Sequence, residues 1–217
     1  MLLLELFSGT GSISKVAEEH GIDCVSVDIM ERFKPSVLTD IHAWDYINEP
    51  LLQTRVDYIH ASPPCTEFSV AMTRRKRNIE EGMRNVKKAF EIISFFKSKN
   101  PLLKWTMENP RGFLRKQAYM NQYKRTMTSY CKYGYPYQKN TDFWYGGFNL
   151  ELRPPCKWDC DQLIVGASVH KATSQKGQCR PGQKYSDNMK WQGLGGRSLR
   201  YSIPKPLCED IIRLFLS

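Results

Sequence analysis

The chain has 217 residues, 41% of them hydrophobic and 25% charged, which is the composition of a folded domain with one full core. Its formal net charge of +10 favours a polyanionic partner such as nucleic acid, although a merely basic protein would have the same balance. The seven cysteines are scattered, which argues against a disulfide scaffold. No stretch approaches the roughly 20 apolar residues of a membrane span, and the start lacks the basic residues of a signal peptide. We therefore expect a soluble intracellular protein, in a cytoplasm or a nucleus.

Short β-rich runs alternate with helical stretches over the first 145 residues, the pattern of crossover connections in a mostly parallel sheet. The predicted strands are Leu2–Phe7, Cys24–Val27, Val56–His60 and Lys104–Met107. Between the last two, apolar residues recur every three or four positions over Ile79–Lys99 and predict a long helix with one buried face. The sequence therefore predicts an α/β core.

The chain changes character at Gly146. Residues 146–197 hold many Pro, Gly and aromatic residues without sustained periodicity, and we interpret them as a small irregular insert. Residues 198–217 contain a last amphipathic helix after Pro206, which should pack back on the core formed by residues 1–145.

A glycine turn follows the first predicted strand. The segment Phe7-Ser8-Gly9-Thr10-Gly11 runs from this strand into a helix, an arrangement that lets the backbone approach a nucleotide-like ligand. Asp28 closes the next strand, where a carboxylate can accept hydrogen bonds from the two ribose hydroxyls of an adenosine. A solvated Asp beside an ordinary glycine turn is the alternative.

Two further strands end close to residues with reactive side chains. Cys65 follows Val56–His60 in a loop stiffened by Pro63 and Pro64, and its thiolate could add to the electron-poor C6 of a pyrimidine. Glu108 follows the strand Lys104–Met107, so its carboxyl group should lie at the same edge of the sheet and could hold N3 of a cytosine. A buried structural cysteine and a helix-capping acid are the alternatives.

These motifs and their order resemble the cytosine-5 DNA methyltransferases. The resemblance implies a Rossmann-like S-adenosylmethionine-dependent methyltransferase sheet that acts on a cytosine swung out of double-stranded DNA. The cofactor-binding residues that it implies are Phe7, Ser8, Gly9, Thr10, Gly11, Asp28, Ile29, Asp40, Ile41, Pro63 and, near the end of the chain, Ser202.

The resemblance also implies the catalytic residues, with Cys65 as the nucleophile and Glu108 as the group that pairs with the base. Lys139 and Thr141 stand where the family has two arginines, so their contact to the base carbonyl departs from the family pattern. Lysine keeps the charge of arginine without its planar fork, and threonine offers only a hydroxyl.

The insert has potential metal ligands of its own. Cys156, Cys160, His170 and Cys179 lie within 24 residues and could form a tetrahedral structural zinc site, although the usual Cys-x-x-Cys pairs are missing and free thiols are the alternative. Just after the Cys65 loop, Arg74-Arg75-Lys76-Arg77 is predicted to close on DNA phosphates.

The sequence thus predicts a DNA (cytosine-5)-methyltransferase with S-adenosylmethionine as methyl donor. Family members read DNA with a variable domain before the last motif, and here only about fifty residues are left for it, so recognition would use few base contacts or help from a second copy or a partner protein. Such a minimal reader would suit a viral or phage genome. Three alternatives stay open: an amino-methyltransferase acting on adenine N6 or cytosine N4, an RNA methyltransferase, and a catalytically silent nucleic-acid-binding homologue.

Overall fold

The computed structural model describes residues 1–166, 168–173, 178–179, 181–182 and 201–217. The strands within these ranges are β1 Leu2–Leu6, β2 Asp23–Asp28, β3 Val37–Leu38, β4 Tyr58–Ala61, β5 Lys104–Pro110, β6 Lys124–Ser129, β7 Asn140–Gly146, β8 Ala172–Thr173 and β9 Gln178–Cys179. The helices are α1 Ser12–Glu19, α2 Ile79–Lys99 and α4 Lys205–Leu216, with 3-10 turns η1 Glu31–Phe33, η2 Pro50–Leu52, η3 Leu114–Lys116, η4 Ala118–Gln122 and η5 Tyr130–Tyr133. None of these helices is long and apolar enough to span a bilayer.

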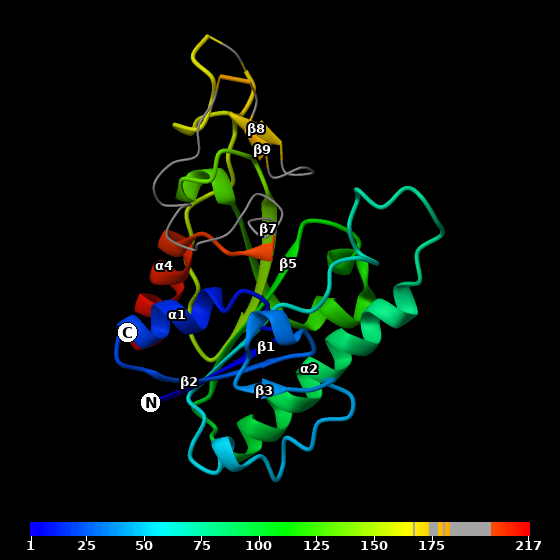
Figure 1. The fold of residues 1–217 in the computed structure, drawn as a ribbon, viewed down its shortest axis with the longest axis vertical. Coiled ribbons are helices and arrows are strands. Elements are labelled where there is room, and N and C mark those ends of the chain that lie inside the picture. The colour runs from blue at the N-terminus through cyan, green and yellow to red at the C-terminus, as the bar shows by residue number, and fades with distance from the viewer. Residues whose placement is uncertain (167, 174–177, 180, 183–200) are drawn as a thin grey trace.

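Seven strands form one sheet in the order β3-β2-β1-β4-β5-β7-β6 (Figure 1). The five strands from β3 to β5 are parallel, whereas β7 lies antiparallel between β5 and β6. The chain runs outward from β1 to β3 and then returns to β4 on the other side of β1, so the strand order reverses between β1 and β4. Open α/β sheets bind ligands beyond the carboxyl ends of the strands at such a reversal.

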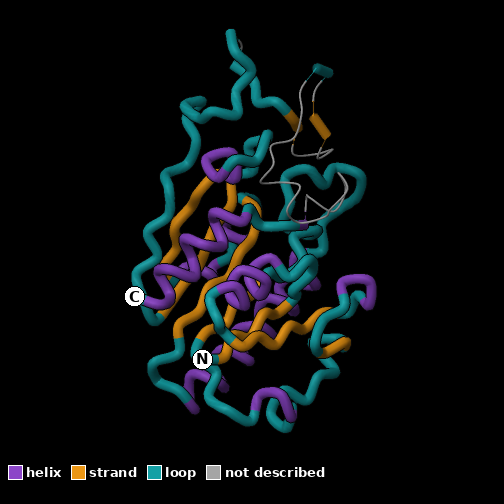
Figure 2. Tube along the Cα trace, turned by 60° about the vertical axis from the view of Figure 1, so that its left-hand side comes forward, coloured by secondary structure: helices purple, strands orange, loops and turns teal. Residues whose placement is uncertain are grey.

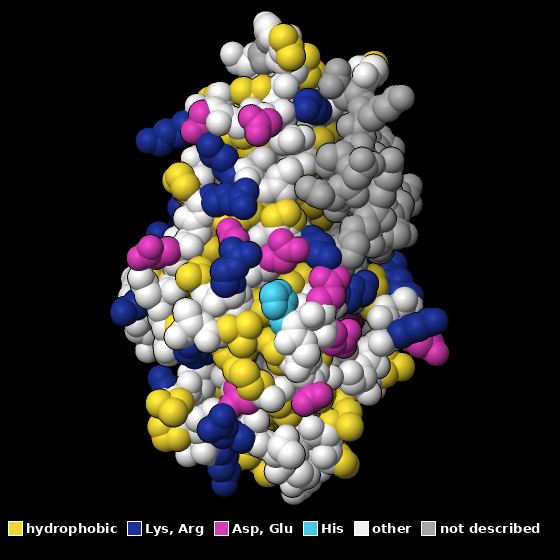
Figure 3. Space-filling model, turned by 90° about the vertical axis from the view of Figure 1, so that its left-hand side faces the viewer, with side chains coloured by type: hydrophobic (Ala, Val, Ile, Leu, Met, Phe, Trp, Pro, Cys, Tyr) yellow, Lys and Arg dark blue, Asp and Glu magenta, His cyan; other side chains and the backbone are white. Residues whose placement is uncertain are grey.

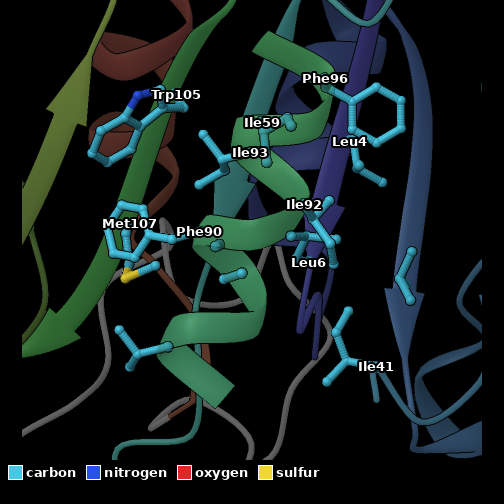
Figure 4. Close-up of a cluster of buried hydrophobic side chains, with 14 of the residues drawn as sticks. Leu4, Leu6, Ile41, Ile59, Phe90, Ile92, Ile93, Phe96, Trp105 and Met107 are labelled. Atoms are coloured by element: carbon cyan, nitrogen blue, oxygen red, sulfur yellow. The ribbon is translucent and has the colours of Figure 1, made fainter. Parts of the chain in front are cut away.

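Helices cover both faces of the sheet (Figure 2). On one face α2 packs its apolar stripe against β1, β4 and β5, and Figure 4 shows Phe90, Ile93 and Phe96 of this helix beside strand residues such as Leu4 and Trp105. On the other face α1 and α4 lie together over a second cluster of buried side chains. The sheet is therefore buried on both sides, which fixes the ends of its central strands.

The bounds of α2 confirm the helix expected from the apolar spacing. Asn78 caps its start, accepting a hydrogen bond from Glu81 N over 3.1 Å, and acidic residues fill its first turn while lysines fill its last. Both features suit the helix dipole. The last helix, α4, likewise begins next to Pro204 and Pro206 as expected.

The expectation of a mostly parallel sheet missed its antiparallel edge. No strand was predicted over residues 124–146, where β6 and β7 form a pair whose exposed side chains are polar. Because β7 pairs with β5 from Trp105 to Pro110, β5 runs three residues beyond its predicted end, and Glu108 lies within the strand rather than after it. Within the described part of residues 147–197 the only strands are the two-residue β8 and β9, and the role of this segment as an insert stays a prediction.

Candidate active site

The turn after β1 has an unusual backbone. Phe7, Gly9 and Gly11 all have φ between 50° and 64°, a region that suits glycine and is rarely adopted by a residue such as Phe. Gly9 N donates to Asp28 Oδ2 over 2.8 Å, and Ser8 N donates to Val27 O over 3.0 Å, so the turn is bound to the end of β2. The turn and Asp28 therefore form one unit, as the sequence motif predicted.

A cavity of about 530 Å³ opens at the carboxyl ends of β1, β2 and β4. Drug-sized and cofactor-sized ligands occupy cavities of about 300–1,000 Å³. The sequence-predicted residues that line it are Phe7, Ser8, Gly9, Asp28, Ile29, Asp40, Ile41, Pro63, Cys65, Glu108 and Lys139. The structure thus brings most of the predicted cofactor and catalytic residues to one cavity.

One end of this cavity suits an adenosine. Phe7, Ile29 and Ile41 give it apolar walls, and Asp28 and Asp40 supply carboxylates. Asp28 already accepts backbone hydrogen bonds from Gly9 and from Met30 over 2.8 Å each, but a carboxylate has about four acceptor positions and can still receive ribose hydroxyls. The residues therefore fit an S-adenosylmethionine molecule.

The loop that carries Cys65 is held from both sides. It leaves β4 at Ala61, and Ser62 N donates to Leu6 O of β1 over 3.1 Å. Asn109 of β5 donates from Nδ2 to Pro63 O over 3.0 Å. Cys65 therefore lies four residues past the strand end, half-buried, on a loop fixed to strands on either side.

Glu108, Tyr130 and Lys139 form a charged group beside Cys65. Tyr130 donates its hydroxyl to Glu108 Oε1 over 3.0 Å, and Lys139 Nζ lies 3.8 Å from the same oxygen and 4.4 Å from the centre of the Tyr130 ring. Burial raises the pKa of Glu108, while Lys139 and Tyr130 oppose that rise. We conclude that burial outweighs the ion pair, so that Glu108 holds its proton to a higher pH than an exposed glutamate.

The thiol of Cys65 has the same environment. Burial raises its pKa, the positive charge of Lys139 lowers it, and a negative charge on Glu108 raises it further. A protonated Glu108 would remove that last contribution. The protonation states of the two groups are therefore coupled through the space that they share with Lys139.

Four predicted site residues do not line the cavity. Thr141 is buried on β7, where its hydroxyl donates to Lys139 O over 3.3 Å. The hydroxyl of Ser202 shares a 2.6 Å hydrogen bond with Tyr135, and Thr10 Oγ1 lies 2.9 Å from Ser12 Oγ. Gly11 is the N-cap of α1. A direct role for these four residues in the site stays a prediction.

Two of the four basic residues that follow the Cys65 loop, Arg75 and Arg77, are already engaged within the protein. Arg75 pairs with Glu67, and Arg77 donates to Ser69 O and Met72 O and lies 4.3 Å above the ring of Phe113. These two side chains stabilise their own loop rather than extending toward a partner. On the face shown in Figure 3, lysine and arginine side chains are interspersed with acidic ones, so the positive charge is not gathered in one patch there.

Glu5 and Tyr130 are among the cavity residues that sequence reasoning missed. Glu5 lines the cavity from within β1 and accepts hydrogen bonds from Ile13 N and Ser14 N at the start of α1, over 3.3 and 3.0 Å. An acid inside an otherwise apolar strand was a signal that could have revealed it. Tyr130 had no such signal, because it follows β6, a strand that the sequence pattern did not show.

The predicted metal ligands are brought together in part. Cys156, Cys160 and His170 converge, and the fourth member of the cluster is Cys131 of η5, which sequence spacing did not suggest. Cys179 lies in β9, opposite Ala172, and its side chain is outside the described part of the chain. Each cluster residue offers one ligand atom, and all four atoms lie within 4.8 Å of one another.

Comparisons with known proteins bear on the family and the fold. The family model of C-5 cytosine-specific DNA methylases matches residues 1–141. No curated protein sequence matches the chain. Among solved structures, a candidate DNA modification methyltransferase encoded within a prophage of E. coli is similar with a TM-score of 0.52 and 19% identity, over 70% of this chain and 49% of that one. At these values the likeness shows the fold, a Rossmann-like methyltransferase sheet.

Two other solved structures are similar at lower scores. A mutant of Spodoptera frugiperda DNMT2 has a TM-score of 0.45 and 17% identity, over 71% of this chain and 54% of that one. The Entamoeba histolytica methyltransferase EhMeth has a TM-score of 0.43 and 16% identity, over 70% and 55%. The chain spans about half the length of each of these proteins.

Proposed function

The chain belongs to the C-5 cytosine-specific DNA methylase family, and we propose that it transfers a methyl group from S-adenosylmethionine to C5 of a cytosine in double-stranded DNA. The observation that carries the proposal is the shared cavity, which is lined both by Cys65 and the Glu108–Lys139 pair and by Asp28 with the turn that it holds. The proposed nucleophile, acid and nucleoside-binding turn therefore face one cavity.

In this proposal Cys65 starts the reaction. Its thiolate adds to C6 of a cytosine that has left the base stack, because C6 cannot be reached inside a duplex. Glu108 donates its proton toward N3, which takes up the electron pair displaced by the attack and leaves C5 electron-rich. The raised pKa of Glu108 supports this role, since a carboxyl group must hold its proton at neutral pH to donate it.

S-adenosylmethionine supplies an electrophilic methyl group on its sulfonium when it is bound. After methylation C5 carries both the methyl group and its original proton. A water molecule takes that proton, and its electron pair forms the double bond between C5 and C6 as Cys65 Sγ leaves C6 as a thiolate. N3 returns the other proton to Glu108. Lys139 lies near both Cys65 and Glu108 and favours their charged forms, so it assists the thiolate at each end of the cycle.

We also propose how the protein reaches its DNA. Residues 146–197 would form the recognition insert, with a second copy or a partner protein adding contacts, and the protein would act inside a cell where DNA is present. The zinc ion predicted for the insert would have a structural role, because none of Cys131, Cys156, Cys160 and His170 is among the residues that line the cavity.

Expression in a bacterial host that lacks DNA methylation tests this function without knowledge of the recognition sequence. Genomic DNA and total RNA are digested to nucleosides and quantified by mass spectrometry for the wild type, Cys65→Ser and the control Cys24→Ser, which changes a thiol on β2 outside the cavity lining. We expect 5-methylcytosine in DNA with the wild type and Cys24→Ser only. N4-methylcytosine or N6-methyladenine would indicate an amino-methyltransferase, a methylated base in RNA alone an RNA enzyme, and no methylated base a silent homologue.

A further inference from the structure

Four metal-binding side chains meet where the core joins the insert. Cys131 comes from η5, directly after the core strand β6, whereas Cys156, Cys160 and His170 come from the segment after β7. Three of the four are buried and Cys160 is partly buried. Three thiols and an imidazole are a common ligand set for structural zinc, and such sites lie in buried, closed positions like this one.

The distances fit a tetrahedral ion. Zinc bonds of about 2.3 Å to sulfur and 2.0–2.1 Å to nitrogen, at tetrahedral angles, place the nitrogen about 3.6 Å from each sulfur. His170 Nε2 lies 3.7 Å from Cys156 Sγ and 3.4 Å from Cys160 Sγ. An imidazole nitrogen carries at most one proton, so a simple hydrogen bond accounts for only one of these two contacts. One ion between the three atoms accounts for both.

We propose that Cys131, Cys156, Cys160 and His170 bind one zinc ion that fastens the insert to the catalytic core. The ligand set replaces Cys179, the fourth ligand that sequence spacing suggested, with a residue 25 positions before Cys156. The difference matters physically. A site within the insert would only stiffen the insert, whereas a site with Cys131 closes a link between two parts of the fold.

Polar contacts around the cluster support such a link. Cys156 N donates to Ser129 Oγ over 2.9 Å, and Gln138 Nε2 donates to Cys156 O over 3.0 Å. Close by, Lys132 Nζ lies 2.8 Å from Asp159 Oδ1. Side chains before and after Cys131 are therefore already bonded to the backbone of Cys156 and to the carboxylate of Asp159, the residue before Cys160.

The link also adjoins the proposed catalytic group. Cys131 follows Tyr130, which donates its hydroxyl to Glu108 and its backbone N–H to Lys139 O over 3.1 Å. A metal bond at Cys131 therefore restrains the segment that positions both Glu108 and Lys139. This positioning effect rests on the proposed function, whereas the zinc site itself does not.

Metal content is the direct test. The full chain, purified without a histidine tag under reducing conditions, should contain one zinc ion per molecule by inductively coupled plasma mass spectrometry. The Cys131→Ser and Cys156→Ser variants should lose at least four fifths of this zinc. The Cys179→Ser and Cys208→Ser variants should keep it. Cys208 is a buried thiol on α4, so its replacement controls for the loss of a core cysteine. A wild type that stays metal-free after incubation with excess zinc, or a Cys131→Ser variant that keeps its zinc, would overturn the proposal.

Cobalt substitution keeps the test decisive if a variant does not fold. Wild-type protein loaded with Co²⁺ should show the intense visible bands of tetrahedral coordination and a thiolate-to-metal charge-transfer band. Only the weak bands of octahedral cobalt would contradict the site. Hydrogen exchange then tests the link: zinc removal should speed exchange severalfold in peptides covering residues 129–140 and leave residues 2–28 unchanged. Unchanged exchange at 129–140 would overturn it, and neither readout depends on methyl transfer.

Discussion

The side-chain amide of Asn109 donates to the backbone carbonyl of Pro63 over 3.0 Å. This bond joins the strand that carries Glu108 to the loop that carries Cys65. Asn109 is fully buried, and its Oδ1 has no hydrogen-bond partner within the described part of the protein. The bond between Asn109 and Pro63 therefore helps to set the separation of the proposed acid from the proposed nucleophile.

Replacing Asn109 with alanine should slow methyl transfer without weakening cofactor binding. The loop loses its tie to β5, and a displacement of about 1 Å at a reacting group can cost about 100-fold in rate. We expect kcat to fall 10- to 100-fold while the Kd for S-adenosylmethionine changes less than twofold. Asn149→Ala, an exposed position after β7, is the control. A parallel loss of cofactor affinity would instead indicate general unfolding of the site.

Lys139 should set the pH optimum. Its charge lowers the pKa of both Cys65 and Glu108, so removing it raises both. Cys65 then ionises only at higher pH, which moves the rising limb of the profile upward, and Glu108 keeps its proton to higher pH, which moves the falling limb upward as well. Lys139→Gln should shift the optimum up by about one pH unit and cut activity at pH 7 about tenfold.

Lys139→Arg provides the matched comparison, because it keeps the charge and should keep the optimum. Rates for the three proteins would be measured across the pH range with saturating S-adenosylmethionine. An optimum that stays in place in Lys139→Gln would show that Lys139 does not act on these two groups.

Asp28 should control cofactor affinity. Hydrogen bonds to a charged acceptor contribute about 1.5–3 kcal/mol each, and Asp28 also holds the Gly9 turn. Asp28→Asn should raise the Kd for S-adenosylmethionine about tenfold by isothermal titration calorimetry, and Asp28→Ala should raise it more. Asp23→Asn changes the exposed acid at the other end of β2 and should leave the Kd unchanged. Equal affinities for all three variants would remove Asp28 from the cofactor site.

The sequence predicted the parts of the fold whose pattern is local. The apolar stripe of Ile79–Lys99 matched α2 residue for residue, and the glycine turn lay next to Asp28 as its spacing indicated. The antiparallel pair β6–β7 was missed because its residues alternate weakly and include Pro136 between the strands. Its pairing with β5 depends on contacts between segments far apart in the chain, which periodicity cannot show.

The same limit applied to the site. Cys65 and Glu108 were predicted as site residues because each comes after a run of residues that is recognisable as a strand in the sequence. Tyr130 and Cys131 were not, because their roles come only from the way η5 folds back beside Glu108 and the insert. Arg75 and Arg77 looked available for DNA in the sequence, but Glu67 and Phe113 engage them. Charge in a sequence does not show which cations are already paired.

His60 should make the protein sensitive to acid. It is fully buried, with its ring nitrogens 2.7 Å from Thr106 Oγ1 and 3.0 Å from Ser62 Oγ, and burial lowers its pKa to about 3. At pH values between the usual histidine pKa near 6.5 and the lowered pKa of about 3, the unfolded chain binds a proton that the folded chain excludes. Stability is therefore retained above about pH 6.5 and lost as the pH falls toward 3, by about 2 kcal/mol between pH 7 and pH 5.

Urea unfolding at pH 7 and pH 5 measures this effect. The wild type should lose more free energy of unfolding between the two pH values than His60→Gln does, by about 2 kcal/mol. His20→Gln, at the exposed end of α1, should behave like the wild type. Parallel losses in the wild type and in His60→Gln would show that His60 is not the group responsible.

The bond between Cys65 and cytosine C6 can be trapped directly. In a random-sequence DNA duplex containing 5-fluorocytosine, the fluorine at C5 cannot leave as a proton does, so methylation would leave Cys65 attached to the base. With S-adenosylmethionine present, the wild type and Cys24→Ser should form a DNA adduct that survives denaturation, and peptide mass spectrometry should place it on Cys65. No adduct with the wild type, or an adduct with Cys65→Ser, would contradict the account.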